Sequence, residues 1–133
     1  MNILRTDTLR KYAQRVRPIL IEVAQQRKLI YYGDLMYRLG GPGRGYIGAV
    51  LDEISETELQ AKRPKLSALV IRKDTKKVSG GFFVFKDTPN AIKRTTPEQR
   101  QNPHLSAADE QYWRSYLQKV YDYWQAHSGK LLS

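Results

Sequence analysis

The sequence of 133 residues contains no cysteine, only two histidines and no long apolar run. Without cysteine, the chain cannot form disulfides, bind zinc through thiolates or use a cysteine nucleophile. A helix that crosses a membrane needs about 20 consecutive apolar residues, and the runs here are far shorter. The N-terminus MNILRTDTLRK also lacks the apolar segment of a secretory signal. We therefore expect a cytoplasmic protein that starts near Met1 and contacts no membrane.

Positive charge, in contrast, is abundant. The chain has 23 Lys and Arg against 13 Asp and Glu, a net charge of +10. The net charge is +6 in residues 1–50 and +8 in residues 61–100, whereas residues 51–60 carry −4 and residues 101–133 are balanced. The electrostatic field of this excess of positive charge attracts polyanions, so we expect a nucleic acid partner, with duplex DNA favoured. An acidic protein partner, or a charge that serves only solubility, are the alternatives.

The first half of the chain has helical periodicity. Apolar residues recur at steps of three and four over residues 8–28, and Pro18 is predicted to kink this helix or divide it. A second helix is predicted over residues 31–39 and a third over residues 44–60. The glycine-rich segment 40–43 separates them, because glycine and proline end helices and allow a sharp turn.

In the second half of the chain, the spacing of the apolar residues is at first no longer helical. Residues 66–72 and 81–86 are short, apolar and rich in β-branched or aromatic side chains, which predicts a β-hairpin with a basic loop. Residues 87–105 contain three prolines and are expected to be an irregular connection. Ser106 is the predicted N-cap of a final helix over residues 107–126. Its apolar seam consists of Trp113, Leu117, Val120 and Trp124, widened by Tyr112, Tyr116 and Tyr123.

This order of elements predicts an α+β fold. We expect one domain over residues 1–133, with a small winged helix-turn-helix at about residues 8–86. The irregular connection and the aromatic-rich C-terminal helix would follow it. In this arrangement the glycine turn joins the two helices of the helix-turn-helix, and the hairpin is the wing.

Four segments resemble a known family. IYYGDL at residues 30–35 and LGGPGRGYIGAV at residues 39–50 are similar to the C-terminal DNA-binding domain of O6-alkylguanine DNA alkyltransferases and alkyltransferase-like proteins. RPKLSALVIRK and VSGGFF resemble the family's following strand and glycine turn. The resemblance covers about residues 30–85 and implies a winged helix that binds DNA. It also implies that the hydroxyl of Tyr32 can contact a phosphate, although this tyrosine could equally cover the core.

The sequence departs from this family at the reactive positions. Val70 occupies the position of the alkyl-accepting cysteine, and Ile71 that of its activating histidine. The family's arginine that fills the space of an extruded base falls on Gly45, and the nearest basic residue is Arg44. Arg44 would point elsewhere, because consecutive helix residues differ by about 100°. We therefore expect a DNA-binding protein without enzymatic activity or a cofactor.

The predicted DNA-binding residues form two groups. The start of the third helix offers free N–H groups and a positive dipole end to a phosphate, and the hairpin loop offers four cations. The groups comprise Tyr32, Gly43, Arg44, Gly45 and Tyr46, and the loop residues Arg72, Lys73, Lys76 and Lys77. The main alternative function is a protein–protein adaptor or inhibitor, such as a phage or mobile-element factor, that docks through its basic or aromatic face. The sequence leaves the oligomeric state open.

Other polar residues have simpler interpretations. Asp52 and Glu56 lie one helical turn apart and could share a metal ion, although no further ligand is evident. If the third helix enters a DNA groove, its acidic residues must face away from the DNA. The basic residues of the first helix, Arg17 among them, are expected to form a solvated face. His104 and His127 have no obvious catalytic partner and are expected at the surface.

Overall fold

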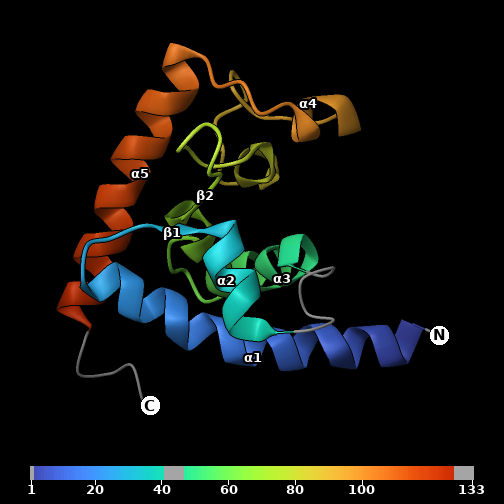
Figure 1. Cartoon of the computed structure of the whole chain (residues 1–133). Helices are drawn as coiled ribbons and strands as arrows, with labels where there is room; N and C mark the ends of the chain where they lie inside the picture. Colours follow the sequence, from blue (N-terminus) through green and yellow to red (C-terminus); the bar gives the residue numbers. More distant parts are fainter. Residues whose placement is uncertain (1, 41–46, 128–133) are drawn as a thin grey trace.

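The computed structural model describes residues 2–40 and 47–127 of the chain. Helix α1 (Asn2–Gln25) runs along one side of the molecule, α2 (Tyr32–Leu39) and α3 (Ile47–Gln60) lie against it, and α5 (Ala107–Ala126) rises from its C-terminal end (Figure 1). The structure is mostly helical with one small parallel sheet, which agrees with the α+β class. The predicted site residues Gly43, Arg44, Gly45 and Tyr46 lie outside the described residues.

Helix α1 is longer than the predicted segment and is not divided at Pro18. A proline inside a helix removes one hydrogen bond and costs about 3 kcal/mol. Apolar side chains on both sides of Pro18, including Val16 and Leu20, are buried in the core. Their burial offsets the local cost, so the helix continues.

The predicted β-hairpin is wrong. Residues 66–72 and 81–86 do not pair; they begin instead with the 3₁₀ turns η2 (Leu66–Leu69) and η3 (Gly80–Val84). The two-residue strand β2 (Val70–Ile71) pairs in parallel with β1 (Ile30–Tyr31), far earlier in the chain. A single antiparallel bridge, Ile71 to Val78, closes the loop of residues 72–77. The continuous apolar runs are buried on several sides, a pattern that periodicity alone cannot assign to strands.

The C-terminal part confirms the predicted helix and corrects the connection before it. Helix α5 begins after Ser106, whose side chain accepts a hydrogen bond from the Asp109 amide in a capping box. The predicted seam is buried. The connection 87–105 contains a short helix, α4 (Pro97–Gln101), with Thr96 as its N-cap and Pro97 in the first turn. Pro97, one of the three prolines that suggested irregularity, therefore starts a helix here.

One apolar cluster joins α1, α2, α3, η2, η3 and α5. The indole Nε1 of Trp113 donates a hydrogen bond of 2.9 Å to the carbonyl of Ala68, which ties α5 to η2. Leu66, Ala68 and Leu69 are fully buried beneath this helix. The core thus fixes the relative positions of α2, α3 and β2.

Two glycines provide a direct test of this packing. A Cβ on Gly80 would lie 2.1 Å from the carbonyl oxygen of Arg100, whereas a Cβ on Gly48 would meet nothing within 4 Å. We expect Gly80→Ala to lower the free energy of unfolding by about 1–3 kcal/mol through overpacking. Gly48→Ala should raise it by about 0.5–1 kcal/mol, because alanine is the better helix former. Urea denaturation of both variants measures the difference, and equal effects would contradict this packing.

Candidate nucleic-acid interface

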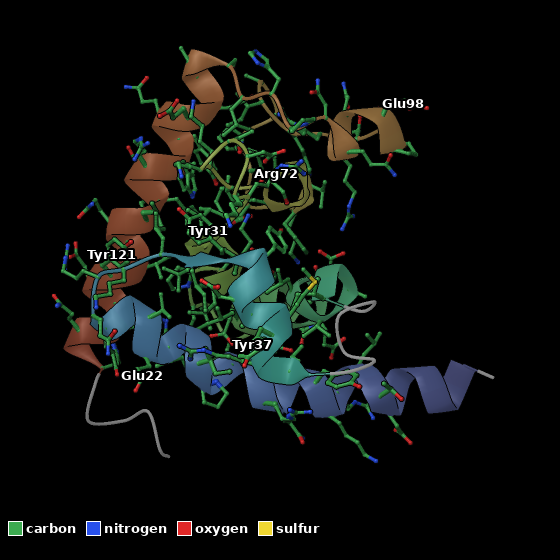
Figure 2. All side chains as sticks on the ribbon, viewed as in Figure 1. Glu22, Tyr31, Tyr37, Arg72, Glu98 and Tyr121 are labelled. Carbon is green, nitrogen blue, oxygen red and sulfur yellow. The ribbon has the colours of Figure 1, made fainter. Side chains whose placement is uncertain are left out.

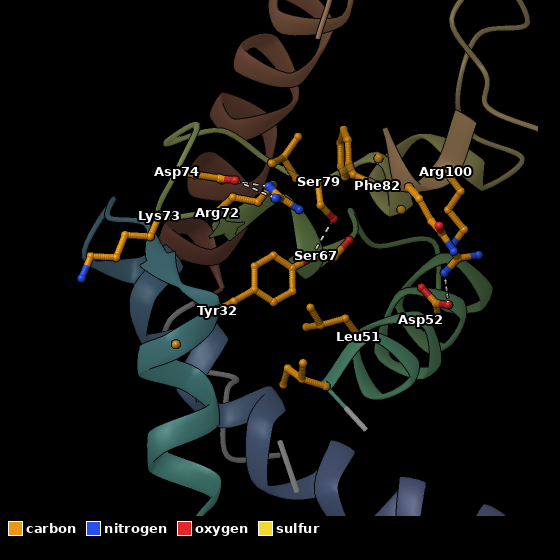
Figure 3. A pocket seen from close by; sticks show the side chains of 17 residues that line it. Tyr32, Leu51, Asp52, Ser67, Arg72, Lys73, Asp74, Ser79, Phe82 and Arg100 are labelled. Carbon is orange, nitrogen blue, oxygen red and sulfur yellow. Dashed lines mark hydrogen bonds and ion pairs between the residues drawn. The ribbon is translucent and has the colours of Figure 1, made fainter. Parts of the chain in front are cut away.

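A pocket of about 660 Å³ opens where several chain segments converge. The first turns of α2 and α3 form one side of it, and residues 72–74 with η3 form the other. Arg100 and Gln101 of α4 complete the wall. Figure 3 shows Tyr32 in the middle of this space, between the basic residues and α3. The pocket therefore collects residues from parts of the chain that are distant in sequence.

Tyr32 belongs to the pocket wall. Its ring comes from the first residue of α2, and its hydroxyl lies 2.8 Å from the Oγ of Ser79. Burial raises the pKa of Tyr32, and the hydrogen bond with Ser79 opposes this only in part. The hydroxyl is therefore protonated at neutral pH and is already bonded within the protein. Ser79 had no distinguishing signal in the sequence except its place in the VSGG segment.

The predicted wing is a tight turn, here called the basic turn (residues 72–77). The amide of Arg72 donates to the carbonyl of Lys77 over 2.9 Å, and Lys76 adopts a positive φ of 58°. The guanidinium of Arg72 makes two hydrogen bonds to Asp74, of 2.9 and 2.7 Å. Arg72 and Lys73 line the pocket together with Tyr32. Three predicted site residues are thus neighbours.

Two other cations of the basic turn are directed elsewhere. The ammonium of Lys77 forms an ion pair of 2.7 Å with Glu110 of α5. The ammonium of Lys76 lies 3.5 Å from the hydroxyl of Tyr31 and 5.7 Å from the centre of its ring. Among the described residues, the ammonium of Lys73 has no such partner, and it points away from Tyr32 in Figure 3. Lys73 is therefore the cation of this turn that is most available to a phosphate.

The start of α3 adjoins the basic turn. Ile47 and Gly48, its first two residues, line the same pocket as Arg72 and Lys73. The described start of α3 and the basic turn therefore border the same pocket.

The opposite end of the pocket carries an ion pair that was not predicted. Asp52 on α3 pairs with Arg100 on α4, and both side chains line the pocket. Burial raises the pKa of the Asp52 carboxyl, whereas the hydrogen bond from Arg100 lowers it. The expectation that all acids of α3 face away from the interface is wrong for Asp52. Arg100 was missed because its segment was interpreted as an irregular connection.

The other residues that the sequence singled out lie outside this pocket. Glu58 is fully buried and bonded to Arg17 and Arg63, so Arg17 is not part of a solvated face. In the described part of the chain, no three His, Asp or Glu residues are grouped so as to hold a metal ion. His104 is exposed, and His127 stacks on Tyr123 at 4.0 Å. Val70 and Ile71 are buried in β2.

Across residues 2–40 and 47–127, none of the helices is both long and apolar enough for a membrane span. The sequence matches no protein-family model, no curated protein and no solved structure.

Proposed function

We propose that this protein binds duplex DNA and catalyses no reaction. The observation that carries the proposal is that the first turn of α3, Arg72 and Lys73 all line one pocket. A helix end and a basic turn on one surface are the two contacts that a winged helix makes with a duplex. In this proposal α2 and α3 form the helix-turn-helix, and residues 71–78 form a wing shorter than the hairpin predicted over residues 66–86. Such a protein would be associated with the nucleoid.

In this proposal, helix α2 adds a contact to the DNA backbone. Tyr37 is 88% exposed and lies on the outward side of α2, near its C-terminal end (Figure 2). Arg38 follows it in the same helical turn. In helix-turn-helix proteins the first helix crosses the phosphate backbone, where hydroxyl and guanidinium groups are common ligands. Tyr37 and Arg38 are therefore expected to touch phosphates that flank the groove.

Substitution of Lys73 tests the proposal. We expect Lys73→Glu to weaken duplex binding about tenfold and to lower the slope of log affinity against log salt by about 1. The matched control is Lys119→Glu, which makes the same charge change at an exposed position of α5 outside the pocket. Fluorescence anisotropy with a paired duplex at several salt concentrations measures both variants. Duplex binding that is absent, or equally sensitive to both changes, would refute the proposal.

The alternative function, a protein–protein adaptor, has an aromatic version and a basic version. Its aromatic version needs an exposed stripe on α5, but Trp113, Tyr116 and Trp124 are buried in the core. Its basic version uses the same surface as DNA and predicts that duplex binding is absent. The anisotropy experiment therefore separates the two functions.

A further inference from the structure

The pocket has two chemically different ends. At one end the carboxylate of Asp52 lies against the guanidinium of Arg100. At the other end are Lys73, the hydroxyl of Tyr32, and Arg72 with its hydrogen-bonded partner Asp74. Leu51, Val78 and Phe82 line the space as well and give it an apolar wall. A ligand that fills this space therefore needs an apolar body, an anionic group and a polar edge.

The polar end is accessible and has a defined pattern. The side chains of Asp52 and Arg100 are 37% and 43% exposed, so a ligand can reach both. An ionised carboxylate only accepts hydrogen bonds, and a guanidinium only donates them. Side by side, they match an edge on which an amino group adjoins a ring nitrogen that accepts. Cytosine and adenine carry such an edge, whereas uracil and hypoxanthine carry a carbonyl beside a ring N–H.

The pocket also has room near the backbone. Gly33 and Gly48 stand in the first turns of α2 and α3, and a Cβ on either would meet nothing within 4 Å. No side chain caps the N-terminus of α2. A volume of about 660 Å³ lies within the range of small-ligand sites. A planar ring can thus lie between these helix ends and the basic turn.

We propose that this pocket binds a nucleotide whose base carries an exocyclic amino group. The amino group donates to Asp52, the neighbouring ring nitrogen accepts from Arg100, and the phosphate lies at the rim formed by Arg72 and Lys73. A carbonyl in place of the amino group would face the carboxylate, unless the base turned over and moved its phosphate away from this rim. The ligand is either a free mononucleotide or an unpaired nucleotide in nucleic acid; only the second source rests on the proposed function.

Calorimetric titration of the full chain with mononucleotides tests the free-ligand source. CMP and UMP differ in one exocyclic group, an amino group or a carbonyl, and in the adjoining ring nitrogen, which accepts in CMP and donates in UMP. AMP and IMP form a second such pair. We expect CMP and AMP to bind about tenfold more tightly than UMP and IMP. Asp52→Asn should reduce this preference to less than about threefold, because an amide can also donate to a carbonyl. The control Glu53→Gln removes the same charge from the next residue of α3, outside this pocket.

A separate binding experiment tests an unpaired nucleotide in nucleic acid as the ligand. Duplexes with one unpaired cytosine or one unpaired thymine are compared by anisotropy with a fully paired duplex. A preference for cytosine of about tenfold that Asp52→Asn removes would support the proposal even if no mononucleotide binds. Circular dichroism confirms that each variant is folded. If Asp52→Asn does not fold, Gly48→Phe replaces it, since its ring would enter the open space of the pocket and should abolish the preference.

The outcomes separate this proposal from the preceding one. No preference for amino-bearing bases in either arm, or a preference that Asp52→Asn leaves unchanged, overturns the nucleotide pocket. Binding of the paired duplex without such a preference would support the proposed function alone. Selective binding of CMP without duplex binding would support the pocket and refute the proposed function.

Discussion

Replacement of Glu58 by alanine is expected to lower the free energy of unfolding by about 3 kcal/mol. The Glu58 side chain is fully buried at the C-terminal end of α3. One carboxylate oxygen accepts from the Nε of Arg17 and the other from the Nε of Arg63, both over 2.7 Å. These bonds join α1, α3 and the segment after α3. Removal of the carboxylate leaves two guanidinium groups without their partner and a cavity between the helices.

The loss of stability in Glu58→Ala depends on how well the guanidinium groups of Arg17 and Arg63 can be rehydrated. Their side chains are 31% and 24% exposed, so part of each guanidinium can be rehydrated after the substitution. This places the loss at the lower end of the range for a broken buried ion pair.

Urea denaturation with a matched variant checks this result. Glu56→Ala removes an exposed carboxylate two residues earlier on α3, and its effect should stay within about 0.5 kcal/mol. If Glu58→Ala and Glu56→Ala lower the free energy of unfolding equally, the bonds of Glu58 to Arg17 and Arg63 do not hold α1 and α3 together.

Lys65→Ala is expected to cost a similar amount, about 3 kcal/mol. The Lys65 side chain is fully buried, and its ammonium donates to the carbonyl of Phe82 over 2.9 Å and to Asp87 over 2.8 Å. It also lies 4.2 Å from the centre of the Phe82 ring and 5.1 Å from that of Tyr116. Burial lowers the pKa of this ammonium, and the hydrogen bond to Asp87 opposes the shift. Alanine would remove both bonds and leave a cavity among the rings.

A second substitution separates the charge from the packing. Lys65→Met keeps an unbranched apolar side chain among the rings, so it should cost only about half as much as alanine. Asp87 would keep the hydrogen bond of 2.8 Å from the Tyr116 hydroxyl and is 24% exposed, so its charge stays solvated. Lys86→Ala, at an exposed position nearby in sequence, is the control for loss of a lysine. Thermal denaturation should show the largest loss of stability for Lys65→Ala, a smaller loss for Lys65→Met and the smallest loss for Lys86→Ala. Equal losses would contradict a packed role for Lys65.

The helices illustrate what local sequence can predict. Helix α5 was assigned to residues 107–126 with Ser106 as its cap, and both are found. Periodicity and capping act within a few residues, so they can be read from the chain itself. Division of the first helix at Pro18, one of the two predicted alternatives, was wrong because the burial of α1 against the rest of the core outweighs a local penalty.

The site illustrates what local sequence does not contain. Tyr32, Arg72 and Lys73 were predicted separately, and the parallel pairing of β1 with β2 brings their segments side by side. The hairpin prediction failed because the apolar runs at 66–72 and 81–86 do not pair with each other, and their side chains join one core with the helices. No local signal marked Arg100 as the partner of Asp52, since 48 residues separate them.

The sequence by itself determined that this protein has no thiol chemistry, an excess of positive charge, one helix that ends at Gly40 and another that begins after Ser106. These properties depend on composition or on neighbours along the chain. Only the tertiary structure decided that Asp52 and Arg100 lie opposite Arg72 in one pocket, and that Glu58 and Lys65 are buried. Such contacts arise because a common core forces distant segments together, and their free energy depends on burial that one-dimensional spacing does not encode.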